Sequence, residues 1–74
     1  MNAEQKKVVK QALDEVASAK AGLEQVRDEL QEAFDDLSEK AQEGERGSKM
    51  QEEIEQLEQA INGLEETEEN APAG

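Results

Sequence analysis

Carboxylates are the most abundant titratable side chains in this 74-residue chain, which has twenty Asp and Glu residues against eight Lys and Arg. A carboxyl group acts as a general acid or base when burial or a close like charge raises its pKa. Adjacent pairs such as Asp28-Glu29 and Glu65-Glu66 point in different directions around a helix, so neither effect is expected. The carboxylates therefore predict an electrostatic role rather than a catalytic one.

The other common catalytic groups are missing from the sequence. There is no histidine, cysteine, tyrosine or tryptophan, which removes the usual general base, the thiolate nucleophile and the imidazole metal ligand. No stretch has the spacing of a calcium-binding loop, and Gly44 and Gly47 lie among glutamates that would repel a phosphate. We expect a protein that is not an enzyme and uses neither a cofactor nor a metal.

Charge is divided unevenly along the chain. Residues 1–20 sum to +1 and residues 21–74 to −13, for a formal net charge of −12. Such a field attracts basic protein surfaces and repels nucleic acid and anionic lipid. The lysine cluster of Lys6, Lys7 and Lys10 is too small to neutralise a DNA backbone. The expected partner is a basic protein, with no direct nucleic-acid binding and no membrane association.

The sequence also bears on location. No apolar run approaches the roughly 18 residues of a membrane span, and no basic-then-apolar signal segment opens the chain. The absence of cysteine is compatible with a reducing compartment. We expect a cytoplasmic protein.

Helix breakers divide the chain into two helical segments. The sequence predicts a long amphipathic helix over residues 3–42, a glycine-containing loop over 43–47 and a second helix over 48–66. Residues 67–74 are expected to be a disordered tail. The whole forms a single domain. Two pairs have the spacing of capping boxes at the starts of these helices: Asn2 with Gln5, and Ser48 with Gln51.

Hydrophobic residues repeat with coiled-coil spacing in both segments. The first segment carries Val9, Val16, Leu23, Leu30 and Leu37 every seven residues, and the second carries Met50, Ile54, Leu57, Ile61 and Leu64. The phase continues across Gly22, which favours one unbroken helix over a three-helix bundle split at that glycine. The predicted fold is all-α: a helical hairpin with coiled-coil packing.

The two predicted helices differ in length. At 1.5 Å per residue they span about 60 Å and about 30 Å, so the second would cover only residues 24–42 of the first. An unpaired amphipathic half-helix is marginal in water. This predicts either an antiparallel homodimer through Val9, Leu13 and Val16 or docking of this stripe onto another protein. Lys20 and Arg27 occupy seam positions, where they either extend their charges to water or select the register of a second chain.

The acidic part of the chain has a charge spacing close to that of DNA. Residues 24–69 hold seventeen carboxylates. On a hairpin about 30 Å long they would lie about 1.8 Å apart along the axis, against about 1.7 Å per phosphate in duplex DNA. In the predicted second helix, Lys49 with Glu53 is the pair whose helical spacing offsets this repulsion. This pattern favours a function that uses the field.

In size, charge and lack of catalytic residues, the chain resembles the small acidic DNA-mimic inhibitors that bacteriophages and mobile elements direct against host DNA enzymes. The resemblance is one of composition, since the Glu-Ser-apolar signature of the uracil-DNA glycosylase inhibitors does not occur. It implies an inhibitor that occupies the basic DNA groove of an enzyme such as uracil-DNA glycosylase or a nuclease, in the cytoplasm of a host bacterium if the protein is phage-encoded. The acidic contact residues would be Asp35, Asp36, Glu39, Glu52, Glu53 and Glu55. Base-flipping enzymes insert an apolar side chain, the wedge residue, into the duplex. An apolar slot for that residue would be formed by Leu30, Phe34, Ile54, Leu57 and Ile61.

The alternative is a coiled-coil structural or adaptor protein that acts by oligomerisation. It follows from the unpaired start of the first helix and needs no basic partner. The two hypotheses differ in salt dependence, because contacts between charged surfaces weaken with ionic strength whereas an apolar seam is almost indifferent to it.

Overall fold

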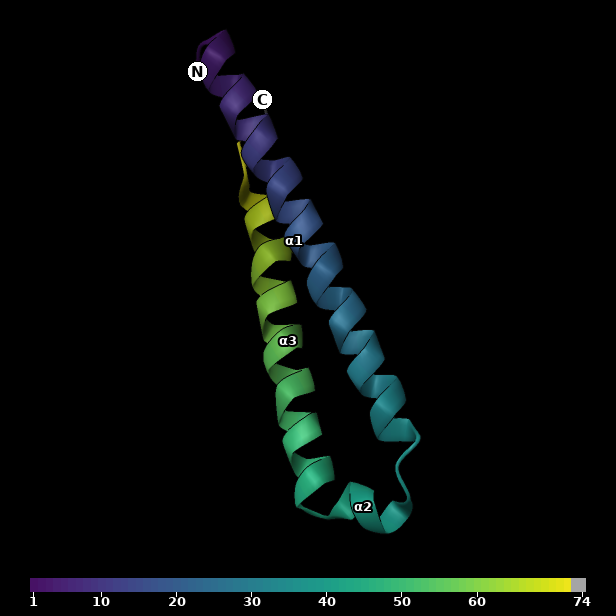
Figure 1. The fold of residues 1–74 in the computed structure, drawn as a ribbon. Coiled ribbons are helices and arrows are strands. Elements are labelled where there is room, and N and C mark those ends of the chain that lie inside the picture. The colour runs from purple at the N-terminus through teal and green to yellow at the C-terminus, as the bar shows by residue number, and fades with distance from the viewer. Residues whose placement is uncertain (73–74) are drawn as a thin grey trace.

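Three helices make up most of residues 1–72, the part of the chain that the computed structural model describes. They are α1 (Ala3–Asp35), α2 (Glu39–Glu43) and α3 (Glu45–Asn70), and no strand occurs in that range. Helices α1 and α3 run side by side in opposite directions, and α2 joins them at one end of a rod measuring 58 × 15 × 13 Å (Figure 1). The predicted all-helical fold is confirmed.

Helix α1 is continuous through Gly22, so the alternative of a bundle split at this glycine is wrong. Its start is the predicted capping box. The Gln5 backbone N–H donates to the Asn2 side-chain oxygen over 2.8 Å, and the Asn2 backbone N–H donates to Gln5 Oε1 over 3.0 Å. Two of the N–H groups that a helix start leaves without partners are thereby satisfied.

The end of α1 corrects the predicted 3–42 helix. The helix stops at Asp35, because Asp35 and Asp36 are poor helix formers and place negative charge at the negative end of the helix dipole. Ser38 then adopts an extended backbone and begins α2, with its side-chain oxygen accepting from the Ala41 N–H over 3.2 Å. Residues 39–43 are helical but belong to a separate element.

The second correction concerns the predicted loop at 43–47. Gly44 alone separates α2 from α3, serving as the C-cap of one and the N-cap of the other. Ser48 lies inside α3 and donates its backbone N–H to the Gly44 carbonyl over 3.0 Å, so the predicted capping box at Ser48 and Gln51 is wrong. Neither Gly44 nor Gly47 has a positive φ.

Helix α3 also ends later than the predicted residue 66. It continues to Asn70, and the Thr67 hydroxyl donates to the Gly63 carbonyl over 3.0 Å. The prediction of a disordered tail is therefore wrong for residues 67–70. Ala71 and Pro72 follow as non-helical chain, and the last two residues of the predicted tail lie outside the described residues.

The seam between α1 and α3 is narrow. Only two large apolar side chains in the described range are buried, Ile54 at 7% exposure and Ile61 at 3%. The remaining predicted seam positions are half-buried: Val9, Leu13, Val16, Leu23, Leu30, Phe34, Leu37, Met50, Leu57 and Leu64. Two helices can cover only one face of each other, so stability depends on a short run of contacts.

Candidate functional site

An ion pair between α1 and α3 marks the register of the hairpin. Lys20 Nζ lies 2.6 Å from Glu68 Oε1, with side-chain exposures of 24% and 31%. Since antiparallel helices rise equally per residue, Asn70 lies close to the level of Ser18. Helix α3 therefore covers α1 from about residue 18 onward, and the predicted coverage of residues 24–42 is wrong because α3 is longer than expected.

The surroundings of Lys20 favour its charged form. The hydrogen bond to Glu68 raises the pKa of Lys20 above its ordinary value of 10.5, the charges of Glu68, Glu65 and Glu24 raise it further, and partial desolvation opposes them. A lysine whose pKa is higher in the folded state stabilises that state below the unfolded pKa, and the contribution is lost as pH rises through the folded pKa.

This sign gives a testable pH dependence. The variant Lys20→Met should melt below the wild type by a difference that is constant from pH 6 to pH 9 and shrinks as the pH rises beyond about 10.5. Thermal unfolding followed by circular dichroism measures it. Arg27→Met is the control. Within residues 1–72 the ion pair of Arg27 is with its sequence neighbour Asp28, so its loss should change the melting temperature little. A Lys20→Met difference that persists undiminished in strong alkali would rule out this account.

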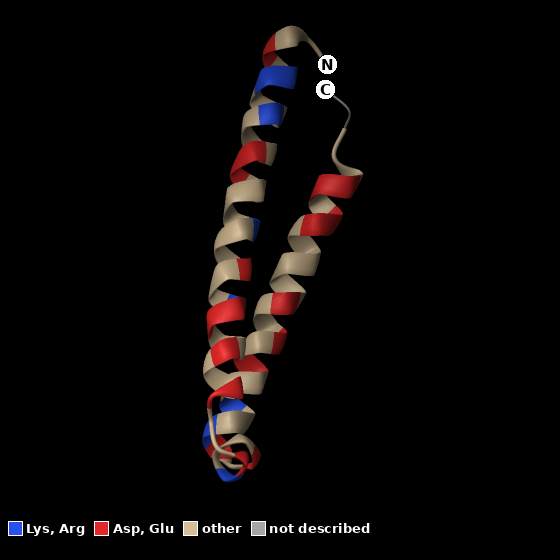
Figure 2. Ribbon diagram, turned by 90° about the vertical axis from the view of Figure 1, so that its right-hand side faces the viewer, with Lys and Arg blue, Asp and Glu red and all other residues tan. Residues whose placement is uncertain are grey.

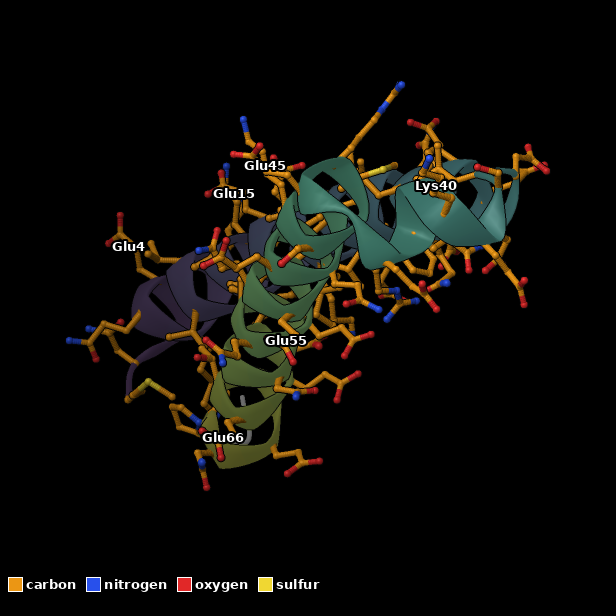
Figure 3. All side chains as sticks on the ribbon, turned by 90° about the horizontal axis from the view of Figure 1, so that it is seen from below. Glu4, Glu15, Lys40, Glu45, Glu55 and Glu66 are labelled. Atoms are coloured by element: carbon orange, nitrogen blue, oxygen red, sulfur yellow. The ribbon has the colours of Figure 1, made fainter. Side chains whose placement is uncertain are left out.

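Most carboxylates of the hairpin have no basic partner. Within residues 1–72 the ion pairs are Lys20 with Glu68 and Arg27 with Asp28. Helix α3 has no basic residue after Lys49, and red bands follow along it in Figure 2, while the broadest blue bands of α1 lie near its start. Charged side chains from all three helices project outward in Figure 3. The acidic field is therefore largely uncompensated.

Some of these carboxylates border an open groove between α1 and α3, here called the acidic groove. It has a volume of about 580 Å³ and mostly polar walls. Its lining residues are Gln31, Phe34, Ser48, Gln51, Glu52, Ile54, Glu55 and Glu58. The arrangement puts three carboxylates beside one aromatic ring, which suits a cationic side chain with an apolar stem.

The predicted acidic residues fall into separate places. Glu52 and Glu55 line the acidic groove, whereas Glu53 is half-buried and does not line it. The other three lie at the junction of α1 and α2. Asp35 accepts from the Gln31 side chain over 3.1 Å, while Asp36 and Glu39 are exposed. The structure thus brings two of the six into one groove.

The predicted apolar slot is mostly occupied by helix packing. Phe34 and Ile54 line the acidic groove, but Leu30 and Leu57 are half-buried seam residues and Ile61 is almost fully enclosed. A wedge from a partner would therefore meet Phe34 and the edge of Ile54.

Sequence reasoning did not identify Gln31 and Glu58 as groove residues. Glu58 continues the helical spacing of Ser48, Glu52 and Glu55 along one face of α3. That periodicity is the signal that was available for it. Gln31 enters through the register of α1 against α3, which local sequence does not determine.

At the opposite end of the rod, α1 carries a second groove, here called the lysine groove. Its volume is about 460 Å³, and it is lined by Ala3, Lys6, Lys7, Val9, Lys10, Leu13 and Pro72. Two of the predicted dimerisation residues, Val9 and Leu13, are in this groove, and Val16 is half-buried beside them. The lysine groove lies near the start of α1, and the acidic groove lies near its end.

Two further features are absent from residues 1–72. No group of three or more acidic side chains there is placed to hold a metal ion. None of the three helices combines the length and apolar character needed to cross a bilayer.

The length of α3 also revises the charge spacing. Its 26 residues extend about 39 Å, so the seventeen carboxylates of residues 24–69 lie about 2.3 Å apart along the axis. The spacing of 1.8 Å is wrong because it rested on a shorter second helix. The charge is still dense, although less so than the roughly 1.7 Å per phosphate of duplex DNA.

Comparison with known proteins adds no relative. No protein-family model, curated protein or solved structure matches the chain. The function must therefore be argued from the charges and surfaces described above.

Proposed function

We propose that this protein is an acidic DNA mimic that inhibits a DNA-processing enzyme, such as uracil-DNA glycosylase or a nuclease, by occupying its basic DNA-binding groove. One observation carries the proposal: within residues 1–72 only Glu68 and Asp28 form ion pairs, so the rod presents a dense field of carboxylates. A field of this sign attracts a surface built to bind phosphates. The protein would act in the cytoplasm, of a host bacterium if it is phage-encoded.

The acidic groove is the proposed contact point. An arginine from the enzyme's DNA groove would lie against Phe34 and pair with Glu52, Glu55 or Glu58. Exposed ion pairs contribute more to the rate of association than to affinity. We therefore expect fast binding that weakens strongly as salt rises.

The test compares two charge reversals of equal size. Glu52→Lys, Glu55→Lys and Glu58→Lys together should abolish binding, because they place positive charge in the acidic groove. Glu4→Lys, Asp14→Lys and Glu15→Lys change the net charge equally at the other end of α1 and should leave most of the binding. The readouts are inhibition of uracil-DNA glycosylase on a uracil-containing duplex and capture of proteins from a bacterial lysate.

Capture is repeated at about 50 mM and about 500 mM salt, a range over which exposed charges become screened. Wild-type protein should retain DNA-binding enzymes at the lower salt and release them at the higher salt or when duplex DNA is added. Retention that neither salt nor DNA disturbs, or equal effects of the two reversals, would contradict mimicry.

A second function, a coiled-coil structural or adaptor protein acting by oligomerisation, is favoured by a separate observation. The seam of α1 continues past the end of α3, where Val9, Leu13 and Val16 remain only half-buried and Val8 is 61% exposed. An antiparallel homodimer would cover these residues. Its assembly through apolar contacts would survive high salt.

A further inference from the structure

Helix α1 extends past its partner helix. With Asn70 near the level of Ser18, residues 3–17 form an overhang about 23 Å long, which is seen above the end of α3 in Figure 1. The overhang carries apolar Val9 and Leu13 together with three lysines in the lysine groove. Met1, at 57% exposure, adds to the apolar surface. Pro72 also lines the lysine groove, so the apolar face is covered in part. A helix segment of this length whose apolar face is otherwise exposed is marginal in water unless something packs against it.

The C-terminal end of α3 carries an excess of negative charge. Its last turns contain Glu65, Glu66, Glu68 and Glu69, and no basic residue lies in the final turn. Carboxylates at the C-terminal end of a helix are repelled by the helix dipole and by one another. Among the residues that the structure describes, Lys20 forms an ion pair with Glu68 alone. The end of α3 therefore favours additional cations.

We infer that a second copy of this chain satisfies both requirements, by packing its overhang antiparallel against the overhang of the first. Helix α3 and the incoming overhang then run in the same direction along α1, one after the other. The lysine-bearing first turns of each copy come to lie at the acidic end of the other copy's α3. Lys6 and Lys7 then lie nearest Glu69 and Glu66, with Lys10 and Glu65 further from this contact on either side, while Val9 and Leu13 continue the seam.

Charge decides the orientation of this contact. A parallel arrangement would place the lysines of both overhangs side by side and leave the acidic ends of α3 facing each other. In the antiparallel arrangement, the lysines of each overhang lie at the acidic end of the other copy's α3. These two contacts, here called the junctions, are equivalent, as a two-fold axis requires. The antiparallel arrangement also lets the positive end of one helix dipole meet the negative end of another.

The inference deepens the second proposed function and rests on it, because it specifies how the homodimer forms. Two rods of 58 Å that overlap by about 23 Å make a rod about 90 Å long. The α2 turns lie at its two far ends, and both acidic grooves remain uncovered. The dimer would therefore be bivalent, with one acidic face at each end.

A charge exchange tests the junction. The first variant combines Lys6→Glu, Lys7→Glu and Lys10→Glu, and the second combines Glu65→Lys, Glu66→Lys and Glu69→Lys. Each places like charges at both junctions of its own dimer and should raise the dimer dissociation constant at least about tenfold. Both changes suit the dipole of the helix that carries them, so circular dichroism should show undiminished helix content.

Mixing the two variants should restore the dimer, because both junctions of the mixed pair join opposite charges. Sedimentation equilibrium gives the mass, and small-angle scattering should give a wild-type particle about 90 Å long. The inference would be overturned if either charge-reversed variant stayed dimeric, or if the equimolar mixture stayed monomeric. A wild-type dimer only about 60 Å long would also overturn it.

A further variant separates this inference from the function on which it rests. Val9→Ser, Leu13→Ser and Val16→Ser should abolish any dimer built through the overhang seam. If this variant is monomeric while the charge reversals have no effect, oligomerisation stands and the charged junction is wrong. A wild-type chain that is monomeric contradicts both, and leaves the DNA-mimic proposal to its own test.

Discussion

Replacing Gly47 with alanine should lower the melting temperature sharply and separate α2 from the start of α3. A Cβ built on Gly47 would lie 2.1 Å from the Gln42 carbonyl oxygen, 2.5 Å from its carbon and 2.6 Å from its Cα. These atoms are backbone, so no side-chain rotation can relieve the overlap and α2 itself must move. Forced overpacking of this kind costs about 1–3 kcal/mol or more, which is a large part of the stability of so small a domain.

The displacement has a second consequence at Gln42. Its side-chain amide donates to the Phe34 carbonyl over 3.0 Å and to the Leu37 carbonyl over 3.2 Å. The Phe34 carbonyl also accepts from the Leu37 N–H over 3.0 Å, and Leu37 lies in the turn after α1, so the two bonds tie α2 to the end of α1 and to that turn. Moving α2 would break them and release the end of α1, which borders the acidic groove through Phe34. Gly47→Ala should therefore weaken partner binding as well as folding.

The matched controls for Gly47 are other glycines in helices. Nothing lies within 4 Å of a Cβ built on Gly22 or Gly63, so Gly22→Ala and Gly63→Ala should each stabilise the fold by about 0.5–1 kcal/mol through helix propensity. Thermal melts at one protein concentration compare the three variants. A Gly47→Ala protein that melts with the wild type would show that the close approach of Gln42 does not exist in solution.

The helices and seam were predictable because they depend on local patterns. The seven-residue repeat placed Leu23, Leu30 and Ile61 on one seam, and the pairing of Asn2 with Gln5 marked the start of α1. An unbroken phase across Gly22 correctly indicated one helix. Each of these signals is contained in a window of a few turns.

The turn between the long helices was not predictable in the same way. The end of α1 at Asp35 depends on Ser38 capping a short helix and on Gln42 reaching back to α1. Ser38 has Ala41 where a capping box would have Glu or Gln, so its signal is weak. Gly47 looked like a turn residue, yet it is needed for space inside α3 rather than for a special φ.

The candidate site was predictable only in part, for a related reason. Glu52, Glu55, Phe34 and Ile54 were identified from charge and periodicity, and the structure places them around one groove. The contribution of Gln31 depends on the register between α1 and α3. That register depends on contacts between residues far apart in the sequence, such as the Lys20 to Glu68 pair, which joins residues 48 positions apart.

Truncating Ile61 should be the most damaging change in the seam. Its side chain is 3% exposed, the lowest among the large apolar residues described. Replacing a buried isoleucine by alanine costs about 2–5 kcal/mol, with the lower values where the surroundings collapse into the space. A seam two helices wide can relax from its open sides, so we expect about 2–3 kcal/mol for Ile61→Ala.

A graded series of truncations separates this packing effect from helix propensity. Leu57→Ala removes a half-buried side chain and should cost less than Ile61→Ala, while Val26→Ala acts on a residue that is 46% exposed and should be neutral or slightly stabilising. Urea unfolding should shift the midpoint in that order with little change of slope. The protein concentration must be held constant, because a dimer would make the midpoint depend on it. Equal losses for Ile61→Ala and Val26→Ala would mean that the seam does not hold the hairpin together, and the acidic groove would then lack the fixed register that brings Phe34 beside Glu52.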